Sequence, residues 1–153
     1  MLNLKFKNVE TILNSGNIIF EAKNSETEFL ESTISESLES HFGFKIPTLV
    51  RKAEFIFQLI EDSPFKEIVI TKDIRLYTSF LRFAVKPEIT LPWKSEDGSY
   101  KILLQKNDTV MSVLDLSLSK TPKAMEALER FYGKDITTRN WNTILKIGKK
   151  LKP

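Results

Sequence analysis

Two short apolar stretches near the start of the chain follow the pattern of paired strands. Residues 9–14 carry Val, Thr and Leu at alternate positions, and residues 18–20 read Ile-Ile-Phe. The tetrapeptide between them, residues 14–17, contains asparagines and Gly16, which tolerate positive φ angles. We therefore predict a β-hairpin here.

The next segment has the spacing of a helix. Leu30, Ile34 and Leu38 recur every four residues. Ser25 to Glu28 have the pattern of a capping box, and Gly43 suits the position after the last turn. Residues 46–51 are then predicted as a short edge strand because they include a proline.

The rest of the chain alternates between predicted strands and helices. Apolar spacing predicts a helix that contains residues 55–60 and ends before Pro64. We predict strands at residues 74–83, 100–105 and 109–116, a long loop at 85–99, a helix from Thr121 to Gly133, and a last helix that begins near Thr137 or Thr138.

The predicted last helix has an apolar stripe at the spacing of a core-facing helix: Trp141, Ile144, Leu145, Gly148 and Leu151. On this pattern Trp141 packs in the core. Because strands and helices do not alternate strictly, the fold class expected is α+β with mostly antiparallel sheets.

Composition is that of an ordinary globular chain. The 153 residues are 41% hydrophobic and 28% charged, with a net charge of +3. No apolar run reaches the roughly 18 residues of a membrane span, and the N-terminus has no secretory pattern. There is no cysteine, which excludes disulfides and thiolate ligands and favours a cytoplasmic location.

The sequence has few residues suited to catalysis. His41 is the only histidine, and it lies at the end of an acidic helix, where the helix dipole explains it. We find no metal-ligand spacing, phosphate loop or dinucleotide fingerprint. The sequence therefore predicts no catalytic residue, no metal and no cofactor.

Polar residues cluster at the predicted start of the last helix. Arg139, Asn140 and Asn142 exceed what helix capping requires, so we predict a binding site there, with Ser15 and Asn17 of the hairpin turn as further candidates. Arg139, Lys146 and Lys150 are predicted to share one basic helix face, which a phosphate or nucleic acid could contact.

Several strings resemble the bacterial family called domain of unknown function 1697. They are Asn8-Val9-Glu10-Thr11, Ser15-Gly16-Asn17, Phe42-Gly43-Phe44, the stretch from Leu114 through Met125, and Thr137-Thr138-Arg139-Asn140-Trp141-Asn142-Thr143. The resemblance implies two ferredoxin-like half-domains, residues 1–66 and 67–153, or one compact unit. It implies no activity.

The resemblance also implies a missing front. Family members typically open with a strand, a Gly- and Asn-rich loop and a helix whose end corresponds to residues 2–6 here. Without that strand, the neighbouring strands would have open edges. The remaining strands could close up, another chain could supply a strand, or the protein could dimerise through the open edges.

Three hypotheses about function follow. The favoured one is a non-catalytic binding or interaction protein that self-associates through open sheet edges. The second is a nucleic-acid or phosphate binder that uses the basic last helix. The third is a truncated member of an enzyme family.

Overall fold

The computed structural model describes residues 4–12, 16–23 and 26–151 of the chain. It divides into two compact units, Met1–Asp62 with Leu145–Pro153, and Ser63–Ile144. The fold is α+β with antiparallel sheets, as predicted. In the first unit the described elements are β1 (Lys7–Ile12), β2 (Asn17–Glu21), α1 (Thr27–Phe42), α2 (Ala53–Glu61) and the end of α4 (Trp141–Leu151).

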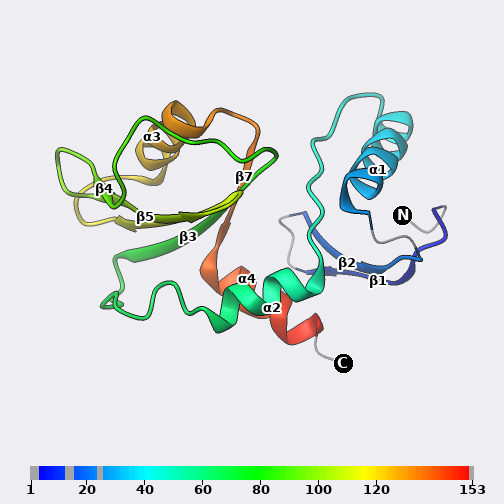
Figure 1. Ribbon diagram of the computed structural model, residues 1–153, viewed down its shortest axis with the longest axis horizontal. Helices are drawn as coiled ribbons and strands as arrows, with labels where there is room; N and C mark the ends of the chain where they lie inside the picture. Colours follow the sequence, from blue (N-terminus) through cyan, green and yellow to red (C-terminus); the bar gives the residue numbers. More distant parts are fainter. Residues whose placement is uncertain (1–3, 13–15, 24–25, 152–153) are drawn as a thin grey trace. The chain divides into compact units, whose positions relative to one another are not determined.

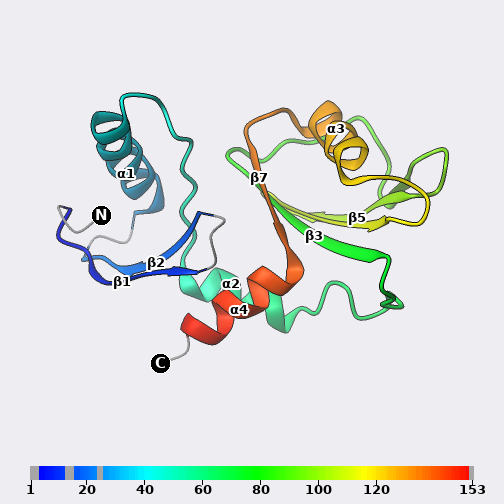
Figure 2. The same cartoon turned by 180° about the vertical axis from the view of Figure 1, so that it is seen from behind.

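The first unit is built around the predicted hairpin, which is confirmed. β1 and β2 pair antiparallel, with Thr11 opposite Ile18, and Phe6 stacks on Phe20 at 4.4 Å between ring centroids. Figures 1 and 2 both show α1 lying over this hairpin. α1 buries Leu30 and Ile34 against the unit.

The predicted end of α1 is confirmed. Gly43 adopts the left-handed conformation with φ 83°, and its N–H donates to the Glu39 carbonyl at 2.8 Å. At the other end, Glu26 is the residue before the first turn and makes no side-chain capping bond. Ser25, the first residue of the predicted capping box, lies outside the described residues.

The strand predicted at residues 46–51 is wrong. This segment is not in a sheet; side chains of α1 satisfy part of its backbone instead. Glu31 Oε2 accepts the Val50 N–H at 2.8 Å, and the Ser35 hydroxyl donates to the Ile46 carbonyl at 3.4 Å. Because a strand needs a ladder partner and these residues have none, the extended backbone bonds to the helix.

α2 and α4 meet at a glycine. A Cβ at Gly148 would come too close to the Ile60 Cδ1 atom, so a larger residue there would require the end of the Ile60 side chain to shift. Gly148 is buried, as its place on the apolar stripe predicts.

The second unit contains a five-stranded sheet with one helix on one face. Its elements are β3 (Ile74–Leu81), β4 (Trp93–Lys94), β5 (Tyr100–Lys106), β6 (Thr109–Asp115), α3 (Thr121–Tyr132), β7 (Ile136–Asn140) and the start of α4. The strand order is β4-β5-β6-β3-β7. In chain order the four longer strands lie 2-3-1-4, as in a ferredoxin-like sheet, with the loop at 82–99 in place of the first crossover helix.

The core of this unit lies between the sheet and α3, which Figure 1 shows over one sheet face. Leu81, Ile102, Val110 and Leu114 of the sheet meet Leu128 of the helix, and each is at most 1% exposed. Burial of such side chains contributes roughly 1.5–3 kcal/mol each, so this cluster is the main source of stability in the unit.

The last predicted helix begins four residues later than the earliest predicted start. Residues 136–140 form β7, which pairs antiparallel with β3 so that Thr138 lies opposite Ser79. α4 begins only at Trp141. The two threonines are β-branched and favour a strand once an open sheet edge is available, and the ladder outweighs their capping preference. The loop at 85–99 also differs slightly, since it contains the two-residue β4.

Candidate interaction surfaces

The two edges of the β1–β2 sheet differ in character. β1 contains a bulge between Lys7 and Glu10, and Asn8 has a φ of 51°. Bulges and charged side chains prevent edge-to-edge pairing in natural sheets. The β1 edge is therefore unsuited to accept another strand.

β2 has the opposite character. It reads Asn-Ile-Ile-Phe-Glu, and its pairing with β1 is regular from Ile19 opposite Glu10 to Asn17 opposite Ile12. Within the described part of the chain, no strand pairs with its other side. Ile18 is 40% exposed, which is high for an apolar strand residue. An unbulged, apolar, one-sided strand is a template for pairing.

The predicted site at residues 139–142 does not form a helix start. Arg139 and Asn140 lie on β7, opposite Thr78 and Tyr77 of β3, and Asn142 lies in the first turn of α4. Asn140 and Asn142 are exposed. The three side chains thus come from two elements rather than from one capped helix end.

The Arg139 side chain is bonded to the backbone of its own strand, β7. Its Nη1 donates to the Thr138 carbonyl at 3.0 Å, and partial burial lowers the pKa of the guanidinium below its ordinary value. Arginine remains charged at this position because its unperturbed pKa is far above neutral. Its burial leaves it less available to a ligand than a surface arginine.

The core position predicted for Trp141 is confirmed. Its ring meets Phe65 edge-on at 5.3 Å between centroids, and it is 9% exposed. A residue packed in this way stabilises the junction of β7 and α4.

The predicted basic helix face is wrong in part. Arg139 lies on a strand and does not share the face, whereas Lys146 and Lys150 are exposed on α4. Lys150 Nζ forms an ion pair with Glu10 Oε1 at 3.1 Å. This pairing reduces the charge that the face presents to a phosphate.

Of the two candidates in the hairpin turn, Ser15 lies outside the described residues. Asn17 Nδ2 donates to the Ile12 carbonyl at 3.3 Å, across the turn. This bond closes the hairpin, which is a structural role for the amide.

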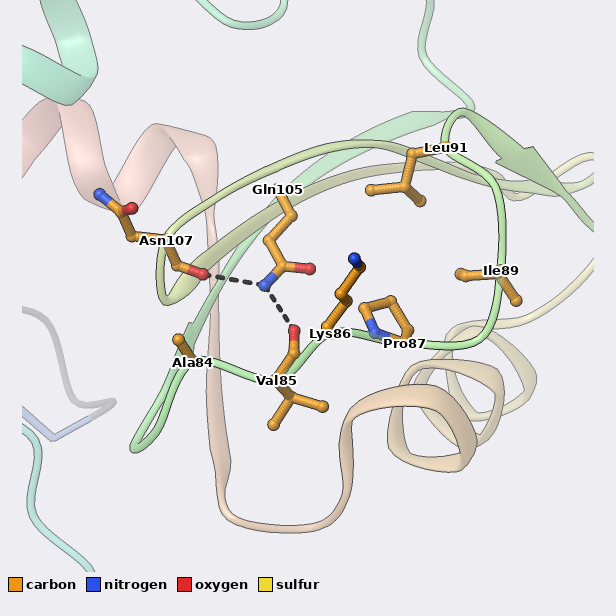
Figure 3. Close-up of a pocket in the computed structure, with 8 residues that line it drawn as sticks. All are labelled: Ala84, Val85, Lys86, Pro87, Ile89, Leu91, Gln105 and Asn107. Carbon is orange, nitrogen blue, oxygen red and sulfur yellow. Dashed lines mark hydrogen bonds between the residues drawn. The ribbon is translucent and has the colours of Figure 1, made fainter.

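A groove that the sequence did not reveal lies in the second unit (Figure 3). It has a volume of about 410 Å³ and lies between the loop at 84–91 and the far end of β5. The residues that surround it are Ala84, Val85, Lys86, Pro87, Ile89, Leu91, Gln105 and Asn107. Its loop was predicted as a long connection, and long loops often carry function, but no periodicity marked these side chains.

Two tyrosines at the other end of the sheet and on α3 carry raised pKa values. Burial raises the pKa of the Tyr100 hydroxyl well above its ordinary value, and the nearby Tyr132 and Tyr77 add to this shift. Burial also raises the pKa of Tyr132. The Tyr100, Ser112 and Tyr132 hydroxyls are buried and make no hydrogen bond of good geometry with a described residue, although the Ser112 hydroxyl lies near enough to Tyr100 to lower its pKa in part. They form a polar spot inside an otherwise apolar core.

Asp97 closes the turn before β5. Its carboxylate accepts the Ser99 hydroxyl at 2.6 Å, the Ser99 N–H at 3.0 Å and the Ser95 hydroxyl at 2.7 Å. These bonds hold the pKa of Asp97 far below its ordinary value, and Lys123 at 3.4 Å contributes in the same direction. The Asp97 carboxylate therefore holds the turn itself.

Two classes of site are not found in the described residues. No group of three or more His, Cys, Asp or Glu side chains is placed to hold a metal ion. No described helix is long and apolar enough to cross a membrane.

Comparison with known proteins gives one match. A family model described as "Protein of unknown function (DUF1697)" matches residues 1–109 of the chain. No curated protein and no solved structure matches the chain.

Proposed function

We propose that this chain, which belongs to the DUF1697 family, is an interaction protein that associates with a second copy of itself through the open edge of β2. The observation that supports the proposal is the contrast between the two edges of one sheet. β1 is bulged and charged, whereas β2 is regular, apolar and paired on one side only.

The sequence of β2 is complementary to itself when two copies run antiparallel. A two-fold axis at Ile19 places Ile18 opposite Phe20 of the second copy, and Ile19 opposite its own equivalent. Asn17 then faces Glu21, so an amide meets a carboxylate and the two Glu21 side chains stay apart. This register also pairs all five strand residues.

The expected dimer is weak. Five strand residues span about 17 Å, and such an edge buries less than the roughly 1,000 Å² of a stable interface. We therefore expect a reversible dimer with a dissociation constant on the order of 100 μM, which gives a standard free energy of about −5.5 kcal/mol. Association should rise with protein concentration.

Ile18→Lys is the variant that tests this proposal. A lysine on an edge strand opposes pairing, and here it would lie opposite Phe20 of the second copy. Because Ile18 is 40% exposed, the fold should tolerate the change. We expect sedimentation equilibrium to show a concentration-dependent dimer for the wild type and a monomer for Ile18→Lys.

Thr11→Lys is the matched control. Thr11 lies directly opposite Ile18 on the same hairpin and is exposed, but it belongs to the bulged strand. It should leave the dimer intact. A wild-type chain that sediments as a monomer at millimolar concentration contradicts the proposal, and so does equal weakening by the two variants.

A nucleic acid bound at the basic end of α4 has less support. Lys146 is exposed there, but Lys150 is paired with Glu10 and Arg139 lies on β7. Binding to single-stranded or duplex DNA at low salt, with affinity that falls steeply as salt rises, would favour this alternative over self-association.

A further inference from the structure

The groove of the second unit has a preformed floor. Val85, Ile89 and Leu91 are half-buried and pack against the hydrophobic core of that unit. β4 pairs only with Ile102 and Lys101 of β5, so the later half of β5 has no strand on this side. The loop fills part of that space and leaves the groove between itself and the strand.

A single side chain fixes the loop to the strand. Gln105 Nε2 donates to the Val85 carbonyl at 2.7 Å and to the Asn107 carbonyl at 2.8 Å. Both acceptors are carbonyl oxygens, so the amide orientation is determined and its oxygen must face the other way. Figure 3 shows that this oxygen is directed into the hollow, away from both dashed bonds.

The groove therefore offers one acceptor and one cation. Gln105 Oε1 accepts no hydrogen bond from a described residue. Lys86 is the only charged residue that lines the groove, and it forms no ion pair with a described residue. The remaining wall is mostly apolar, which is the usual composition of a small-molecule site.

We propose that this groove binds an apolar carboxylate that carries an N–H donor next to its acid group. The carboxylate pairs with the Lys86 ammonium, the N–H donates to Gln105 Oε1, and the apolar body lies on Ile89 and Leu91. An N-acylated apolar amino acid and the C-terminal residue of a peptide share this chemistry. The site lies in a different unit from β2, and this proposal does not rest on self-association.

The test uses N-acetyl-L-leucine and its amide, N-acetyl-L-leucinamide, added to the full chain labelled with ¹⁵N. For a ligand of this size we expect a dissociation constant of roughly 1 mM. The acid should shift the amide signals of Val85, Lys86 and Gln105 with saturation, and the neutral amide should bind at least about tenfold more weakly. Equal binding of both compounds, or no saturable shift, overturns the proposal.

Lys86→Gln and Lys72→Gln separate a specific site from general attraction of an acid to a basic protein. Both lysines are exposed in the second unit, but only Lys86 lines the groove. Lys86→Gln should weaken binding of the acid about tenfold, and Lys72→Gln should leave it unchanged. Equal effects of the two variants contradict the assignment of Lys86.

A peptide that ends in leucine distinguishes the two sources of the carboxylate. If it binds at least about tenfold more tightly than N-acetyl-L-leucine, the natural ligand is a protein C-terminus, because residues before the last one add contacts along the open part of β5. If both bind equally, the ligand is a free small molecule. Either result leaves the assigned chemistry in place.

Discussion

At the scale of single residues, polar side chains hold backbone segments that no strand ladder holds. Glu31 holds the segment after α1, and Gln105 holds the loop beside β5, each by accepting from or donating to main-chain groups. Sequence patterns cannot reveal such bonds, since the partners are separated by 19 and 20 residues. This is why residues 46–51 were predicted as a strand and the groove was not predicted.

Asp97→Asn should change the acid stability of the chain. The folded pKa of Asp97 is depressed, so its ionised form stabilises the fold above the unfolded value of about 3.9, and this contribution disappears as the pH falls. The wild type should therefore exceed Asp97→Asn in urea midpoint at pH 6, and the difference should shrink below pH ~4. A difference that is constant from pH 6 to pH 2 contradicts the assignment.

Ser99→Ala provides an intermediate case. Its hydroxyl is the first cause of the Asp97 shift, whereas its N–H remains. The acid-dependent part of the stability should fall between those of the wild type and Asp97→Asn.

Tyr100→Phe should be neutral or stabilising. The buried Tyr100 hydroxyl makes no hydrogen bond of good geometry, and such a group costs roughly 1–3 kcal/mol. Loss of its interaction with Ser112 offsets part of this cost, so its removal should raise the free energy of unfolding by up to ~1 kcal/mol. Tyr77→Phe is the control, because the Tyr77 hydroxyl lies 3.4 Å from the Thr121 hydroxyl and its loss should destabilise the fold. Chemical denaturation that ranks the two variants in the reverse order contradicts this account.

The same tyrosine predicts behaviour at high pH. Burial raises the folded pKa of Tyr100 above the unfolded value of about 10, so the residue adds no pH dependence below pH ~10. Above that pH the unfolded state ionises first and the fold loses stability. Tyr100→Phe should lose less stability than the wild type between pH 9 and pH 11.

At the scale of elements, local pattern predicted most of the structure. The hairpins, α1, α2 and α3 formed where alternation or helical spacing indicated them. The errors are residues 46–51 and 136–140, and both depend on whether a sheet partner exists. Thr137 and Thr138 form a strand because an edge of β3 is available for them to pair with. Residues 46–51 have no such partner and lie outside any sheet.

The contact of α2 with α4 gives a prediction at this scale. Gly148→Ala gains about 1 kcal/mol of helix propensity but places a Cβ against Ile60 Cδ1. In the wild-type background we expect the forced shift of Ile60 to cancel most of this gain. With Ile60→Val, which removes that methyl, Gly148→Ala should instead stabilise by up to ~1 kcal/mol. Additive effects in a double-mutant cycle would show that the helices do not meet there.

At the scale of the whole molecule, two surfaces in separate units carry the proposed functions. The β2 edge belongs to the first unit and the groove to the second. The sequence favoured an interaction protein with open edges, and the structure locates the regular edge on β2. The sequence could not predict the groove, because residues 84–91 have neither alternation nor helical spacing.

The most direct test of self-association through β2 uses the absence of cysteine from the chain. With the two-fold axis at Ile19, single cysteines at position 19 lie opposite each other, roughly 4.5–5.5 Å apart at Cβ. Two residues at position 18 are offset along the strands and lie too far apart for a disulfide.

We therefore predict that Ile19→Cys forms disulfide dimers under mild oxidation, and that Ile18→Cys does so much more slowly. This order is the reverse of what exposure alone would give, since Ile18 is the more exposed of the two. Faster cross-linking of Ile18→Cys, or no dimer from Ile19→Cys at concentrations above the dissociation constant, would contradict the proposed pairing of β2 with itself.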